Sequence, residues 1–232
     1  MKKIGLLGGM SWESTSIYYR IINEGIAKSL GGLHSAEIIL YSLDFEELAQ
    51  LQAAGKWKQA GLLLAEAAQR IEGAGAEGVL LCTNTMHKIS RAIVESIGVP
   101  FLHVCDAIGE ALLVKKIKKV GLLATAFTME QDFYRSYIQD KYGVEVIIPE
   151  KSDRGIVHRV IYDELCKGII LDDSRKSYVR IVDELAEQGA DGVILGCTEI
   201  CMLISQADTT VTLLDSTEIH AQKAVAFSIS EK

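Results

Sequence analysis

Two stretches of the sequence resemble each other, and both end in side chains that could handle a proton. Residues 75–85 read GAEGVLLCTNT and residues 189–199 read GADGVILGCTE. Each has an apolar run typical of a buried parallel strand, followed by small polar residues. Aligning the two copies places Thr83 opposite Cys197. A thiol is the better proton acceptor of the two, so we expect the chemistry to centre on Cys197.

Cys197 lies where an expected strand gives way to an expected helix. The N-terminus of a helix can lower the pKa of a thiol from about 8.5, which would make Cys197 a base or a nucleophile. The alternative is a small buried apolar residue, which suits the other four cysteines better. Glu199 could orient the reacting side chain, accept a proton or bind a substrate ammonium. The alternative is a carboxylate that only stabilises the start of a helix, which is common.

Further polar residues follow the expected strands, at the edge where parallel sheets bind ligands. Their hydroxyls, amide and backbone N–H groups could bind a substrate carboxylate without any metal. The alternative role of each hydroxyl is to cap a helix. We expect His87 and His220 to be structural. The expected substrate-binding residues are Met10, Asn84, Thr85, Thr125, Thr128, Thr198 and Glu199, with Gln52 and Lys167 as candidates for a side-chain carboxylate.

Strand and helix patterns alternate along the chain, which predicts an α/β fold with parallel sheets. The opening strand pattern recurs after 116 residues and the GAEG-type copy after 114, so a duplicated unit is expected. We therefore predict two α/β domains, 1–114 and 115–215, with a C-terminal helix at about 216–232 that could pack back on the first. The expected strands are 3–7, 38–42, 78–82, 99–103, 120–124, 144–148, 192–195 and 211–214.

The expected helices differ in length. Residues 14–29 and 56–73 carry long helical patterns, whereas residues 44–52 suggest a loop with a short helix. In the second half we expect helices at 129–142, 155–167 and 172–188, and a terminal one at 216–228.

Composition narrows the class of partner. The 232 residues include 24 basic and 31 acidic side chains, and a net charge of −7 argues against a nucleic-acid surface. No apolar run reaches about 18 residues and the start lacks a signal-peptide pattern, so we expect no membrane span and a cytoplasmic location. Five cysteines without a CxxC pair predict neither a disulfide framework nor a zinc site.

At its motifs the sequence resembles the cofactor-independent aspartate/glutamate racemases, and more closely their aspartate and broad-specificity branch. The residues that carry the resemblance are Gly8-Gly9-Met10 with Thr15, Asn84-Thr85-Met86-His87, Gly121-Leu122-Leu123-Ala124-Thr125, Gly196-Cys197-Thr198-Glu199, and Leu214-Asp215-Ser216-Thr217 with His220. The resemblance implies two pseudo-symmetric domains with the active site in the cleft between them, no cofactor, a small acidic amino acid as substrate, and a homodimer.

The resemblance also implies two cysteines on opposite faces of the substrate Cα, one removing the α-proton and the other returning one. Hydrogen bonds from Asn84, Thr85, Thr125 and Thr198 would stabilise the developing negative charge. Here Thr83 stands where the family has its first cysteine, and Cys82 should point to the opposite face of its strand.

We therefore expect an L-selective racemase of aspartate or glutamate, with Cys197 as the base and Thr83 as a weak proton relay. The alternatives are a single-cysteine decarboxylase, a dicarboxylate isomerase of the same superfamily, or an amino-acid-binding protein without turnover.

Overall fold

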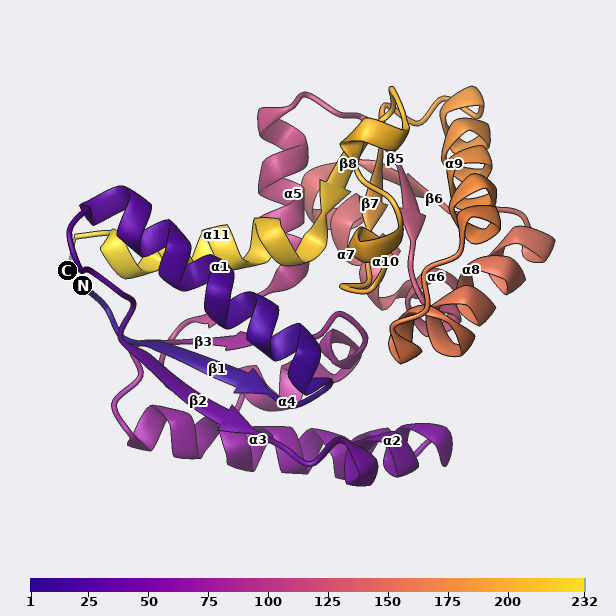
Figure 1. Ribbon diagram of the computed structural model, residues 1–232. Coiled ribbons are helices and arrows are strands. Elements are labelled where there is room, and N and C mark those ends of the chain that lie inside the picture. The colour runs from indigo at the N-terminus through magenta and orange to yellow at the C-terminus, as the bar shows by residue number, and fades with distance from the viewer. Residues whose placement is uncertain (232) are drawn as a thin grey trace. The chain divides into compact units, whose positions relative to one another are not determined.

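The chain forms two α/β units. The computed structural model describes residues 1–231, which divide into residues 1–104 with the C-terminal segment from 220, and residues 105–219. Within residues 1–231 the strands form two four-stranded, fully parallel sheets of strand order β2-β1-β3-β4 and β6-β5-β7-β8. The same order recurs in both units, which confirms the predicted α/β class and its internal duplication (Figure 1).

The first unit follows the predicted alternation of strands and helices. Its elements are β1 (Ile4–Gly8), α1 (Trp12–Leu30), β2 (Ile38–Ser42), α2 (Phe45–Ala53), α3 (Trp57–Gly73), β3 (Gly78–Leu81), the 3-10 helix η1 (Thr85–Ile89), α4 (Ser90–Val94), β4 (Phe101–Leu102) and the later part of α11 (Ser216–Ile229). Segment 44–52 is almost entirely helical, because the Asp44 side chain caps α2 by accepting a hydrogen bond from the Glu46 N–H at 3.1 Å.

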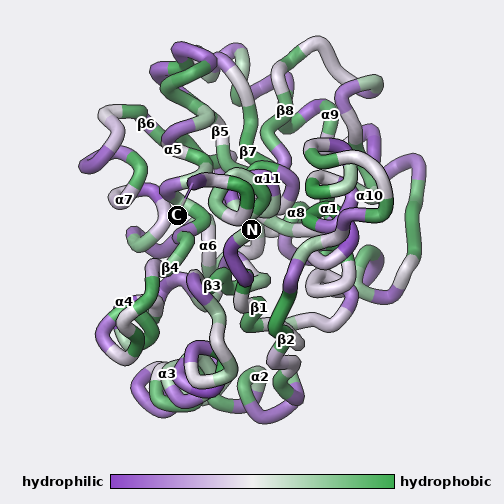
Figure 2. Tube along the Cα trace, turned by 90° about the vertical axis from the view of Figure 1, so that its left-hand side faces the viewer, coloured by the Kyte–Doolittle hydropathy of each residue, from purple (hydrophilic) through white to green (hydrophobic). Residues whose placement is uncertain are grey.

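Successive residues of β1 face opposite sides of this sheet, as the period of a strand requires. Leu7 packs with α3 residues such as Leu64, whereas Leu6 packs with α1 residues such as Ile22. Figure 1 shows α1 and α3 on opposite faces of β1 and β3. In Figure 2 the turns of α3 alternate between hydrophobic and hydrophilic colours, because only its sheet-facing side is buried.

The second unit repeats the pattern with more helices. Its elements are α5 (Val104–Val114), β5 (Lys119–Leu123), α6 (Ala126–Glu130), α7 (Asp132–Tyr142), β6 (Glu145–Ile147), α8 (Lys151–Asp163), the 3-10 helix η2 (Leu165–Lys167), α9 (Asp172–Glu187), β7 (Gly192–Leu195), α10 (Ile200–Leu203), the 3-10 helix η3 (Gln206–Asp208) and β8 (Thr212–Asp215). The single helix predicted over 129–142 is two, because Gln131 adopts an extended backbone conformation between α6 and α7. Every helix of residues 1–231 is too short or too polar to cross a membrane.

Helix α5 groups with the second unit, although the sequence placed residues 105–114 with the first. Asp106 on α5 accepts hydrogen bonds from Tyr137, Lys141 and Tyr142, all on α7, at 2.9, 2.8 and 2.7 Å. Burial raises the pKa of the Asp106 carboxyl, but the three donors outweigh it and hold that pKa below its ordinary value. One carboxylate therefore joins α5 to α7.

Replacing Asp106 with asparagine is expected to lower the free energy of unfolding by about 2 kcal/mol at pH 7, since three hydrogen bonds lose their charged acceptor. A group with a lowered folded-state pKa stabilises the fold above its unfolded pKa, so this difference should shrink as the pH falls below about 4. Urea unfolding of both proteins at pH 7 and at a pH below about 4 measures this difference. Asp132→Asn is the control, because its ion pair with Arg135 is solvated. Equal effects of the two changes would contradict the prediction.

Candidate functional site

The end of β7 carries a thiol next to a carboxylate. The half-buried Cys197 donates its S–H to Oε2 of Glu199 at 2.9 Å. The Thr198 hydroxyl donates to the same oxygen at 2.8 Å. One oxygen of Glu199 thus accepts the hydrogen bond of the thiol, and a proton can pass from Cys197 to Glu199 without diffusing to solvent.

The pKa of the Cys197 thiol is raised well above its ordinary value. Burial is the largest cause, followed by the negative charge of Glu199 and the hydrogen bond to it. The expectation that a helix N-terminus lowers this pKa is therefore wrong. Helix α10 has only four residues, Ile200–Leu203, and Glu199 stands at its N-cap, so burial and this carboxylate outweigh a weak helix dipole.

The end of β5 lies beside the end of β7. Leu123 pairs with Leu195 in the parallel register, so Thr125 and Cys197, each two residues farther along, reach the same edge of the sheet. The hydroxyls of Thr125 and Thr128 are 3.4 Å apart and both residues are buried. The structure therefore brings two of the predicted substrate-binding threonines to the sheet edge that also carries Cys197.

His158 is a polar group at this edge that the sequence did not single out. Its Nδ1 accepts the Ala126 N–H at 3.2 Å, so in the neutral ring the Nε2 carries the hydrogen. Burial, followed by the charges of Cys197, Cys166 and Glu199, raises the pKa of Tyr162 to about 12. His158 and Tyr162 lie inside α8 and do not directly follow a strand, so the pattern of polar residues at strand ends could not have revealed them.

The remaining candidate of this unit is Lys167 on η2. Its ammonium lies 3.7 Å from the Asp163 carboxylate, and both side chains are exposed. Segment η2 contacts α10, the helix that follows Glu199. Segment η2 therefore lies next to α10, and the role of Lys167 with a side-chain carboxylate stays a prediction.

In the first unit, the turn after β1 is closed by side chains of α1. The Gly9 N–H donates to Thr15 Oγ1 at 2.9 Å, and the Thr15 hydroxyl donates to the Ser11 carbonyl at 2.8 Å. Ser11 is the N-cap of α1, whereas Ser14 donates its hydroxyl to the Cys82 carbonyl at 3.2 Å. Thr15 therefore fixes the turn that carries Met10, whose side chain is buried in the core on the α3 side.

Thr83 follows β3 and is half-buried, and its backbone is held by a histidine. The buried His87 accepts the Val104 N–H on Nε2 at 3.2 Å, so its Nδ1 carries a hydrogen and donates it to the Thr83 carbonyl at 2.7 Å. Asn84 is buried and Thr85 half-buried. Cys82 lies fully buried in the α1-side core, where burial raises its pKa, and that it does not replace Thr83 stays a prediction.

Gln52, the other candidate for a side-chain carboxylate, lies half-buried near the end of α2. Thr83 and Gln52 belong to the first unit, and Cys197 and Lys167 to the second. Within residues 1–231 no three histidine, cysteine or carboxylate side chains gather in a way that could hold a metal ion.

Comparison with known proteins decides the family. The family described as Asp/Glu/Hydantoin racemase matches residues 7–224. The chain belongs to this racemase family. Residues that carried the resemblance in sequence, the Gly8–Thr15 turn and the Cys197–Glu199 pair, are also those that the fold places at strand ends.

Individual members of the racemase family cover nearly the whole chain. A Yersinia pestis protein described as a candidate Asp/Glu racemase is 50% identical, with a TM-score of 0.96 over 99% of this chain and 100% of its own. An aspartate racemase homologue from Pyrococcus horikoshii is 34% identical, with a TM-score of 0.89 over 99% of this chain and 100% of its own. The broad specificity amino-acid racemase RacX of Bacillus subtilis is 21% identical, covering 96% of each chain.

The family motif residue His220 has a structural role in the first unit. Its Nε2 donates to the Leu102 carbonyl at 2.7 Å, and its Nδ1 accepts the Tyr18 hydroxyl at 3.0 Å. Burial lowers the pKa of His220 to about 3, and burial together with the neighbouring histidines lowers that of His87 well below its ordinary value. Both rings are therefore neutral at physiological pH.

Acid is expected to destabilise the protein through these rings. Because both folded-state pKa values are lowered, the unfolded chain binds protons first as the pH falls below about 6.5. Stability is thus intact above that pH and is lost below it, by roughly 2 kcal/mol for His220 at pH 5. Urea unfolding at pH 7 and pH 5 measures this loss.

His220→Asn should reduce that pH-dependent loss, whereas His34→Gln, on an exposed histidine, should leave it unchanged. An unfolding free energy that is flat between pH 7 and pH 5 would contradict the prediction.

Proposed function

We propose that this protein is a cofactor-independent racemase of acidic amino acids, acting on L-aspartate, L-glutamate or both. The observation that carries the proposal is the Cys197 thiol donating to Glu199 at 2.9 Å at the end of a parallel strand. Membership of the racemase family and the names of its members support the substrate class.

The first step would move two protons. The thiol proton of Cys197 passes to Glu199, and the resulting thiolate takes the α-proton from the L-enantiomer, leaving the electron pair on Cα and the carboxylate. Hydrogen bonds from Asn84, Thr85 and Thr125 are proposed to stabilise that charge. Thr198 already donates to Glu199, so its part would be to hold this carboxylate in place.

The second step would return a proton to the opposite face of Cα from Thr83. The hydroxyl gives up its proton and regains one from solvent, so Thr83 acts as a relay, and Glu199 releases to solvent the proton that it took from Cys197. A hydroxyl is a far weaker base than a thiolate, so abstraction from the D-enantiomer should be slow. The proposal is therefore an enzyme selective for L-substrates.

The decisive experiment is chiral analysis of L- and D-aspartate, L- and D-glutamate and a panel of other amino acids after incubation with the purified protein, without added cofactor. The proposal expects formation of the D-enantiomer from L-aspartate or L-glutamate. Release of carbon dioxide from a malonate-type substrate would favour a single-cysteine decarboxylase instead. Calorimetric binding of L-glutamate without α-proton exchange would favour a binding protein.

The predicted homodimer and cytoplasmic location belong to the same proposal.

Replacing Glu199 with glutamine is expected to lower kcat at pH 7 by roughly 30-fold, because the thiol loses its proton acceptor. In this variant Cys197 must release its proton to solvent. Burial still raises its pKa, so the rate should increase with pH over a range in which the native rate is flat. Initial rates between pH 6 and pH 9 measure the effect. A variant that matches the native enzyme across this range would show that Glu199 does not accept the proton.

A further inference from the structure

The segment that carries Cys197 and Glu199 is one continuous hydrogen-bonded turn. The Ile200 N–H donates to the Cys197 carbonyl at 3.2 Å, and the Met202 N–H to the Glu199 carbonyl at 3.1 Å. The turn continues into α10, whose Ile200 and Leu203 side chains are fully buried. A displacement at the end of α10 would therefore be transmitted to the thiol–carboxylate pair.

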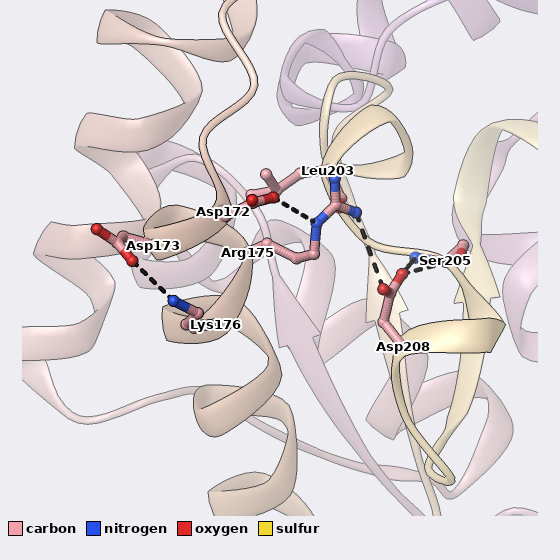
Figure 3. A network of polar contacts seen from close by, with 7 residues as sticks. All are labelled: Asp172, Asp173, Arg175, Lys176, Leu203, Ser205 and Asp208. Atoms are coloured by element: carbon pink, nitrogen blue, oxygen red, sulfur yellow. Dashed lines mark hydrogen bonds and ion pairs between the residues drawn. The ribbon is translucent and has the colours of Figure 1, made fainter.

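The far end of this short helix is held from outside by Arg175. Its Nη1 donates to the Leu203 carbonyl, which belongs to the last turn of α10 and has no acceptor role within so short a helix (Figure 3). The same nitrogen lies 3.8 Å from Oδ1 of Asp208, and the other oxygen of Asp208 accepts the N–H and hydroxyl of Ser205 at 2.8 and 2.9 Å. Arg175 thus joins α9 to both α10 and the capped turn η3.

The neighbouring charges on α9 behave differently. Asp172 lies 3.8 Å from Nε of Arg175 with a side chain that is 88% exposed, and Lys176 pairs only with the exposed Asp173 in the contacts that Figure 3 draws. Solvated pairs of this kind contribute little. Arg175 is therefore distinguished from its neighbours by its contact with the backbone of α10.

We propose that Arg175 is a positioning residue for the proposed racemase reaction, holding α10 so that Cys197 stays hydrogen-bonded to Glu199. Arg175 acts through the backbone and requires no contact with substrate. The inference rests on the proposed role of Cys197, and it assigns a function to a side chain 22 residues upstream of the thiol that no sequence motif includes.

The test is Arg175→Met, with Lys176→Met as the matched control and Asp172→Asn as a second one. Site-resolved alkylation of Cys197 by iodoacetamide, followed by peptide mass spectrometry, reports on the thiol without any substrate. Burial and the neighbouring Glu199 both raise the pKa of Cys197, and loosening α10 should expose the thiol and separate it from that carboxylate, so alkylation at pH 8 should become roughly threefold faster. At the same time kcat for L-aspartate or L-glutamate should fall roughly tenfold with little change in KM.

A more reactive thiol combined with slower catalysis is not expected from a general loss of stability. Native alkylation and kcat in Arg175→Met, or equal effects in Lys176→Met, would overturn the inference. If Arg175→Met does not fold, Arg175→Lys decides, because a single ammonium cannot reproduce the guanidinium fork toward Leu203 and Asp208. An alkylation profile of Arg175→Lys identical to that of the native protein would also overturn it. If the native protein racemises nothing but the alkylation shift is observed, the proposed function fails while the positioning of Cys197 by Arg175 stands.

Discussion

Cys197→Ala protein is expected to exchange no α-proton of L-aspartate or L-glutamate in deuterium oxide. The substitution removes the thiol that donates to Glu199 at 2.9 Å, and the carboxylate that remains there is a much weaker base than a thiolate. Loss of a positioned general base costs up to about 10⁴-fold in rate, so exchange should fall to the background of the buffer. Proton NMR of the α-position, followed over hours, measures it.

The matched control is Cys201→Ala, four residues farther along the same segment. Cys201 is also half-buried, and burial together with the charge of Asp215 raises the pKa of its thiol. Since the thiol of Cys201 is hydrogen-bonded to Asp215, removing this thiol should leave exchange close to the native rate. Retained exchange in Cys197→Ala, or its loss in Cys201→Ala, would remove Cys197 as the base. Circular dichroism of both variants excludes misfolding as the cause.

Much of the architecture could be predicted from the sequence, because strands and helices each have a characteristic period of hydrophobic residues. The run Gly192–Leu195 and the run Ile38–Ser42 were predicted with their observed bounds. The duplication was readable because the two copies keep nearly equal spacing, and the strand order is the same in both sheets.

Local patterns fail where a tertiary contact decides the structure. The helix predicted over 129–142 is interrupted at Gln131, within an otherwise continuous helical pattern. Helix α5 joins the second unit through Asp106 and its three hydrogen-bond donors on α7. Neither event has a signature within a window of neighbouring residues. The expected boundary after residue 114 rested on the sequence repeat, which locates the strand and not the helix before it.

The direction of the pKa shift of Cys197 was predicted wrongly from the sequence. A cysteine followed by a helix suggested a lowered pKa, yet Glu199 two residues later is in direct contact with Cys197 and the pKa is raised. The sequence contains both residues but not the rotamers that bring them together. A protonated thiol has to lose its proton before it can act as a base, and Glu199 is the acceptor already in contact with it, which is the reason for the part proposed for Glu199 in the reaction.

Thr83→Cys is expected to accelerate α-proton exchange of D-aspartate or D-glutamate by roughly 10²-fold, the contribution typical of a positioned acid–base group. Thr83 is half-buried at the end of β3, and its carbonyl is held by His87 at 2.7 Å, so a cysteine there would inherit a fixed backbone. The thiolate can abstract a proton where the hydroxyl mainly relays one. Exchange from the L-enantiomer should change much less, since Cys197 remains its base.

The kinetic form of this gain is constrained by the equal free energies of the two enantiomers. Because their equilibrium constant is 1, kcat/KM must be the same in both directions, so the asymmetry of the native enzyme has to appear in kcat and in solvent exchange of the D-substrate. Thr83→Ser is the matched control, because it keeps a hydroxyl and should bring no gain with the D-enantiomer. If Thr83→Cys folds and still leaves D-substrate exchange unchanged, Thr83 does not serve the D face and the proposed pairing of Thr83 with Cys197 is wrong.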